Sequence, residues 1–224
     1  MFRNRNCKWG IFYCDPECYK RYERFIFNKK FFPELTNKWK LFTGAQPHKF
    51  LESLNIKFDF LLLDTAHLMP GEAINFIEVL PFLEENAIVV LHDITYHLLS
   101  EEIYGLKVKK SYFSNIYLMT SLFGEKIILE NKTKVLENIG AIKLYPNQKR
   151  FYLNYFLLLL SPWEYIPEKK HIDELKLFIK KYYKKDIYIN LFNKAVEENK
   201  NMIEIRKWAF YHLLYQVKFY LYIY

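Results

Sequence analysis

The sequence from Phe58 to Asp93 holds two apolar runs, and each run ends in an acid and a histidine. Asp64 and His67 follow the first run, and His92 and Asp93 follow the second. A short run that is apolar on both faces is typical of a strand in a parallel sheet covered by helices. Because the carboxyl ends of parallel strands meet at one edge of a sheet, we expect these side chains to converge there.

Segments with strand and helix patterns alternate along the first half of the chain, with short connections between them. In the last of the helices, Ala73, Phe76, Ile77 and Leu80 recur with the helical period and form one apolar face. This alternation predicts an α/β domain with a parallel sheet. The predicted strands are 8–15, 38–45, 58–64 and 87–93, and the predicted helices are 16–27, 47–55 and 69–80.

The pattern becomes less regular after Asp93 and then mainly helical. We predict an α/β domain over residues 1–150 and a mainly helical extension over 151–224. The first part would still contain helices around 101–110 and 114–124 and a strand at 138–145; helices are predicted in the extension at 150–160, 172–183 and 205–224.

Composition and charge exclude some classes of protein. The chain has 224 residues, of which 51% are hydrophobic and 26% charged, a globular composition. The net charge of +8 is scattered, and no nucleic-acid-binding motif is present, so a solvated basic surface is favoured over a nucleic-acid partner. In the extension, basic and aromatic residues interleave, which suits either peripheral membrane contact or, the favoured interpretation, a helical cap on the domain or on a second subunit of a homo-oligomer.

Cysteine usage and apolar length bear on the cellular location. Cys7, Cys14 and Cys18 form neither an even disulfide framework nor a CxxC pair, which predicts a reduced, cytoplasmic setting. No signal-peptide pattern is visible, and the longest apolar run, 155–160, is too short to span a bilayer. The prediction is a protein without a transmembrane segment, soluble or peripherally attached.

The acids that end the strands allow two chemistries and one purely structural role. Two carboxylates and an imidazole at one sheet edge could bind a hard divalent cation, or could orient a substrate hydroxyl and take its proton. Alternatively, Asp15, Asp64 and Asp93 are each helix N-caps, and the histidines are structural. Gly44, after the second predicted strand, could likewise only form a turn.

The order and spacing of these motifs resemble class I S-adenosylmethionine-dependent methyltransferases, over roughly residues 8–95. The stretch from Phe58 to Asp93 is similar to the second half of such enzymes, especially small-molecule and sugar O-methyltransferases with an aspartate–x–x–histidine after strand four and a histidine–aspartate after strand five. This resemblance implies a Rossmann-like sheet and a catalytic function. Composition and periodicity alone do not predict that function.

The resemblance also implies residue roles. Asp15 would hold the ribose hydroxyls of S-adenosylmethionine, and Gly44 and Ala45 would lie near its adenine. Asp64 would serve cofactor binding and, with Asp93, would ligate Mg²⁺ or another divalent cation. Candidate catalytic residues are then His67, His92 and Asp93, with one histidine as the base.

The chain departs from the family at its best-known motif. None of its six glycines forms a G-x-G, although the family's loop after strand one brings backbone amides close to the cofactor. If residues 8–15 are the family's second strand, the central first strand is missing, and a gap flanked by unpaired backbone groups is expected. The chain would then be a fragment, a degenerate member, or a protein in which another segment fills the gap.

Two functions follow as hypotheses. The leading one is an O-methyltransferase that acts on a sugar or other small hydroxylated acceptor. If the chain is a fragment or a degenerate member, the enzyme would be truncated or inactive in this form. The alternative is a non-catalytic binding or scaffold protein on a degenerate methyltransferase fold, suggested by the missing glycine loop.

Overall fold

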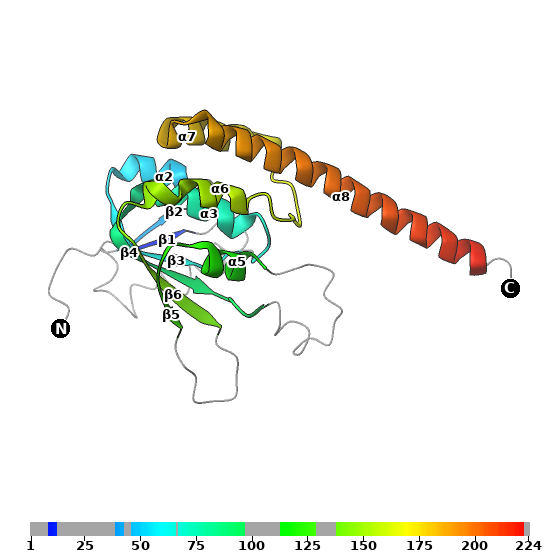
Figure 1. Cartoon of the computed structure of the whole chain (residues 1–224), viewed down its shortest axis with the longest axis horizontal. Helices are drawn as coiled ribbons and strands as arrows, with labels where there is room; N and C mark the ends of the chain where they lie inside the picture. The colour runs from blue at the N-terminus through cyan, green and yellow to red at the C-terminus, as the bar shows by residue number, and fades with distance from the viewer. Residues whose placement is uncertain are drawn as a thin grey trace. The chain divides into compact units, whose positions relative to one another are not determined.

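The structure, a computed structural model, describes residues 9–12, 39–42, 46–65, 67–96, 113–128 and 138–221; for 9–12, 39–42, 128 and 207–221 it describes the backbone alone. The chain forms two compact units, residues 1–56 and 57–224, which are treated separately below (Figure 1). The division at residue 150 that the sequence suggests stays a prediction.

The first unit contains two strands and a helix. Strand β1 (Trp9–Phe12) pairs in parallel with β2 (Trp39–Phe42), which confirms the central residues of the first two predicted strands. Helix α2 (Pro47–Leu54) follows, with Pro47 in its first turn, where a missing N–H costs nothing. The predicted helix over 16–27 lies outside the described residues.

The second unit is built on a mixed four-stranded sheet rather than a fully parallel one. Strands β3 and β4 are parallel, but β6 is antiparallel to both of its neighbours, β4 and β5. The predicted parallel pairing therefore holds for β3 and β4, whereas β6 runs against its two neighbours and makes the sheet mixed. Strand β5 was not predicted, because its charged residues interrupt the apolar pattern. The strands are β3 (Phe58–Leu63), β4 (Leu83–His92), β5 (Gly124–Ile128) and β6 (Ile139–Leu144), in the order β3-β4-β6-β5.

The second unit also contains the helices described here, and most of them lie near their predicted positions. The exception is α8, which begins at Asp186, well before the predicted start at 205. Lys184 in the left-handed region ends α7, and the acidic Asp186 suits the positive end of the next helix. The elements are α3 (Gly71–Val79), η1 (Leu80–Phe82), α5 (Ser114–Ser121), η2 (Gln148–Phe151), α6 (Tyr152–Leu158), α7 (Lys169–Tyr183) and α8 (Asp186–Leu221).

One face of the four-stranded sheet forms the core together with α3, α5 and α6. All four residues of the predicted apolar face of α3 are buried, which confirms that pattern. Helix α5 lies close against β6 at Gly140. A Cβ atom added at this glycine would lie 2.9 Å from the sulfur of Met119 on α5. The sheet residues that point into this core are Leu61, Leu63, Ala87, Val89, Leu91, Ile142 and Leu144.

The opposite face of the sheet is apolar and open. Strand β3 is apolar on both faces, as predicted, but among the described residues no helix covers its second face. Register places Leu62 beside Val90, Val90 beside Ala141 and Ala141 beside Ile127, so the exposed side chains form one continuous band. The large side chains of this band that stand exposed are Phe60, Leu62, Ile88, Ile127 and Ile139.

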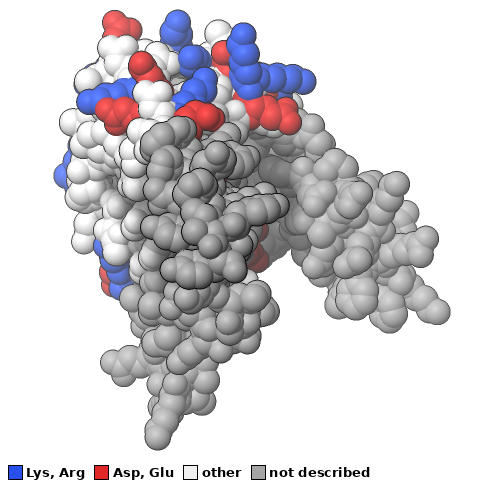
Figure 2. Space-filling view, turned by 90° about the vertical axis from the view of Figure 1, so that its right-hand side faces the viewer, with Lys and Arg blue, Asp and Glu red and all other residues white. Residues whose placement is uncertain are grey.

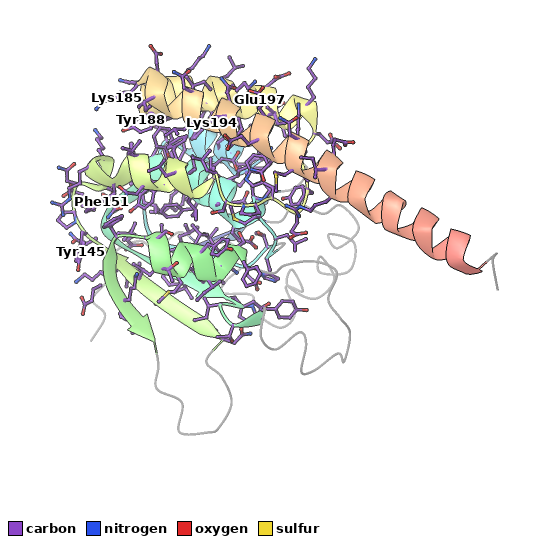
Figure 3. The ribbon with its side chains drawn as sticks, turned by 45° about the vertical axis from the view of Figure 1, so that its right-hand side comes forward. Tyr145, Phe151, Lys185, Tyr188, Lys194 and Glu197 are labelled. Atoms are coloured by element: carbon purple, nitrogen blue, oxygen red, sulfur yellow. The ribbon has the colours of Figure 1, made fainter. Side chains whose placement is uncertain are left out.

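An aromatic cluster holds α6, α7 and α8 together. The ring of Tyr188 on α8 lies 5.0 Å from that of Phe156 on α6 and 5.8 Å from that of Tyr183 on α7 (Figure 3). Tyr183 donates a hydrogen bond of 2.6 Å to the carbonyl of Ile77, which ties α7 to α3. Burial raises the pKa of the neighbouring Tyr155 to about 12, so its hydroxyl stays protonated at ordinary pH.

The outer surfaces of α7 and α8 carry both signs of charge. Figure 2 shows Lys and Arg interleaved with Asp and Glu at the top of the molecule, where these helices lie. Lys194 and Glu198 approach to 3.6 Å at a spacing of four residues. This mixed surface matches a solvated helical cap better than a uniformly basic binding face. No helix in the described part of the chain is both long enough and apolar enough to cross a membrane.

Buried Asn199 joins α8 to the segment before α7. Its Oδ1 accepts a 2.7 Å hydrogen bond from the backbone N–H of Trp163, and its Nδ2 donates to the carbonyls of Ala195 and Ser161. The same segment continues to Glu164, whose N–H donates to the carbonyl of Met69 at 2.9 Å. One polar side chain thus fixes a connection that leads from α8 to the loop before α3.

We expect Asn199→Ala to lower the free energy of unfolding by about 2 to 3 kcal/mol, because it leaves the buried Trp163 N–H without an acceptor. Asn193 lies on the same helix but is exposed, so Asn193→Ala should change stability by less than about 0.5 kcal/mol. Urea denaturation of both variants measures the difference. Equal losses would show that the buried hydrogen bonds of Asn199 contribute little.

Candidate functional site

The register of β3 and β4 brings two of the sequence motifs together. Leu63 pairs with Leu91, so Asp64, just past the end of β3, lies level with His92, the last residue of β4. Their side chains meet, with 3.3 Å between Oδ1 of Asp64 and Nδ1 of His92. The expected convergence at the carboxyl ends of these strands is therefore present in the structure.

His67 and Asp93 complete the cluster. Nε2 of His67 lies 3.1 Å from Oδ2 of Asp93 and 3.7 Å from Oδ1 of Asp64. Nδ1 of His92 lies 3.4 Å from the same oxygen of Asp93. All four side chains singled out at the ends of these two strands thus face one another across a few ångströms.

The backbone at two of these positions is held in an uncommon conformation. His67 has φ 57° and Asp93 has φ 58°, both in the left-handed region. That region costs a residue other than glycine about 1 kcal/mol or more, although Asp and His tolerate it better than most. Such conformations cluster at functional sites, where neighbouring contacts hold them in place.

The cluster has an open side and a closed side. The side chains of Asp64 and His92 are 48% and 38% exposed, whereas those of His67 and Asp93 are 16% and 13% exposed. The ring of Tyr96 lies 5.7 Å from that of His67. A ligand would therefore meet Asp64 and His92 first, and the inner pair would be reached behind them.

Three residues that sequence reasoning missed support the cluster from behind. Asn138 donates from Nδ2 to Oδ1 of Asp93, and Asn115 donates from Nδ2 to the carbonyl of His92 and lies 3.2 Å from Nδ1 of His67. Glu72, fully buried, accepts from the backbone N–H of His67. No periodic signal could have identified the two asparagines, because their partners lie 23 to 48 positions away in the chain.

The structural alternative for Asp64 does not hold. Helix α3 begins at Gly71 with Pro70 as its N-cap and has no capping side chain, so Asp64 is not the N-cap of that helix. The carboxylate of Asp93 contacts His67, His92 and Asn138. The proposed cofactor residues Asp15, Gly44 and Ala45 lie outside the described residues, and their roles stay predictions.

The donor atoms fit a divalent cation. Asp64, His67 and Asp93 each offer one ligand atom, and these three atoms all lie within 4.8 Å of one another. Atoms that share a cation about 2 Å away lie roughly 3 to 3.5 Å apart, close to the separations measured from Nε2 of His67. An imidazole nitrogen beside two carboxylates favours a first-row transition ion such as Mn²⁺ over Ca²⁺, which takes oxygen ligands.

No protein-family model matches this sequence, and no curated protein matches it either. The resemblance to methyltransferases rests on the residues already described and stays a prediction.

We expect the wild-type chain to bind one Mn²⁺ ion, and Asp64→Asn and Asp93→Asn each to weaken binding at least about tenfold, because each removes a charged ligand. Asparagine is chosen because it tolerates the left-handed backbone of residue 93. Electron paramagnetic resonance of free Mn²⁺ gives the affinity.

The matched control is Asp59→Asn, on the exposed part of the same strand β3, which should bind Mn²⁺ as the wild type does. Equal affinities for all four proteins would contradict a cation site at these residues.

Proposed function

We propose that the chain has the fold of a class I methyltransferase and serves transfer of a methyl group from S-adenosylmethionine to a hydroxyl of a sugar or other small acceptor. The observation that carries the proposal is the cluster of Asp64, His67, His92 and Asp93 at the carboxyl ends of two adjacent parallel strands. Such a sheet edge is where α/β proteins bind ligands.

The chemistry of the cluster suits activation of a hydroxyl. When bound, S-adenosylmethionine supplies the methyl group, and a divalent cation lowers the pKa of a hydroxyl that it contacts. Asp64 and Asp93, with His67, would hold the cation and orient the acceptor. Two carboxylates flank Nδ1 of His92, so they would orient its exposed ring and stabilise the imidazolium that forms when Nε2 takes the proton.

The arrangement of the strands supports the same fold. Strands β1 and β2 form one parallel pair, and β3 and β4 form another within the mixed sheet. Among the described residues β3 has β4 as its sole sheet partner, and the two sheets are separate. Each parallel pair, taken by itself, is compatible with part of a methyltransferase sheet. In this interpretation Asp15 binds the ribose, and Gly44 and Ala45 lie at the adenine.

A second function is favoured by the sequence of the chain itself. The sequence contains no G-x-G, the motif with which the family brings its backbone close to the methionine part of the cofactor. A non-catalytic binding protein on the same fold would keep the acidic edge for a cation or ligand and would have lost the methyl donor. The two functions differ in one respect that can be measured, namely binding of S-adenosylmethionine.

Calorimetric titration of S-adenosylmethionine into the full chain, in the presence of Mn²⁺, tests the proposal. We expect wild-type binding that falls at least about tenfold in Asp15→Ala, because the ribose hydroxyls lose their acceptor. Cys14→Ala, at the neighbouring position, is the control and should bind as the wild type does. Absence of binding to the wild type would rule out methyl transfer by this chain and favour the binding protein.

A further inference from the structure

Glu72 is a fully buried acid next to His67, behind the cluster of Asp64, His67, His92 and Asp93. It lies in the first turn of α3, where the helix dipole favours a negative charge. Its Oε1 accepts a 2.8 Å hydrogen bond from the hydroxyl of Thr65 and a second hydrogen bond from the backbone N–H of His67. The loop between β3 and α3 is thus folded around this carboxylate.

The other oxygen of Glu72 has no hydrogen-bond partner among the described residues. A buried carboxylate with one unsatisfied oxygen is costly unless a positive charge lies close by. Among the described residues His67 can supply or transmit such a charge, because its Nδ1 lies 3.5 Å from Oε1 of Glu72. The burial of Glu72 therefore has a physical reason if a cation binds on the far side of the His67 ring.

The two ring nitrogens of His67 face opposite groups. Nε2 points to Asp93 and Asp64, whereas Nδ1 lies 3.2 Å from Nδ2 of Asn115 and 3.5 Å from Glu72. A neutral imidazole carries one proton and one lone pair on its two nitrogens. The distances suit one arrangement of the metal-free ring, in which Asn115 donates to Nδ1 and the proton on Nε2 is donated to Asp93.

A cation at Nε2 reverses this arrangement. Coordination requires the lone pair on Nε2, so the single proton must lie on Nδ1. Nδ2 of Asn115 donates to the carbonyl of His92, and this hydrogen bond holds the same NH2 group toward His67. The amide therefore presents a donor to Nδ1 and cannot accept its proton. Oε1 of Glu72 lies 3.5 Å from Nδ1 and is an acceptor on that side of the ring.

We propose that Glu72 is the positioning residue of the cation site: its carboxylate accepts the Nδ1 proton of His67 and so presents the Nε2 lone pair to a divalent transition ion held with Asp64 and Asp93. The inference rests on the cation binding put forward under the proposed function, and not on methyl transfer. It assigns a role to a buried acid that the reaction chemistry itself does not use.

The test compares Mn²⁺ affinity with stability in two isosteric variants. Glu72→Gln should weaken Mn²⁺ binding about 10- to 100-fold, because it removes the negative charge behind His67. Glu78→Gln is the matched control, because Glu78 is equally buried and lies six residues further along the same helix. It should keep wild-type affinity, whatever its free energy of unfolding.

A second measurement needs no variant. In wild-type chain loaded with diamagnetic Zn²⁺, nitrogen-15 shifts of the imidazoles should show His67 protonated at Nδ1, and in the metal-free chain protonated at Nε2. A Zn²⁺ form with an unprotonated Nδ1, or a Glu72→Gln affinity equal to wild type, overturns the role of Glu72 alone. Absence of Mn²⁺ binding to the wild type overturns the cation site and this role with it.

Discussion

The parallel pairing of β3 with β4 is the constraint on which the rest of the site depends. Leu63 lies opposite Leu91, so Asp64 and His92 emerge side by side, and the buried sides of both strands anchor them in the core. A shift of one residue would turn Leu61, Leu63, Val89 or Leu91 toward the open face of the sheet, and the loss of burial opposes it. Hydrophobic burial thereby sets the separation of the polar groups.

Behind this edge, single polar side chains hold the site residues in place through hydrogen bonds. Asn138 holds Asp93, Asn115 holds the carbonyl of His92, and Glu72 holds the loop that carries His67. These contacts keep His67 and Asp93 in left-handed conformations that the chain would otherwise avoid. Two of the three side chains that would hold a cation, those of His67 and Asp93, thus stand on left-handed backbone.

Among the described residues β4 is the one sheet partner of β3, and the sequence contains no G-x-G. Both observations are compatible with the proposed methyltransferase sheet and with a binding protein that has lost the donor site. The cluster of Asp64, His67, His92 and Asp93 is common to the two interpretations, because all four residues lie in the second unit. Its chemistry can therefore be studied whether or not the chain binds S-adenosylmethionine.

The sequence by itself determined the α/β class, the two strands that end in acids, the apolar face of α3 and the four side chains of the cluster, because periodicity and strand ends are local properties. Only the tertiary structure decided that β5 and β6 run antiparallel, that α8 begins at Asp186, and that Glu72 is buried. Pairing direction and burial depend on contacts between residues far apart in the chain, such as Asn115 with His67. A local pattern carries no record of those contacts.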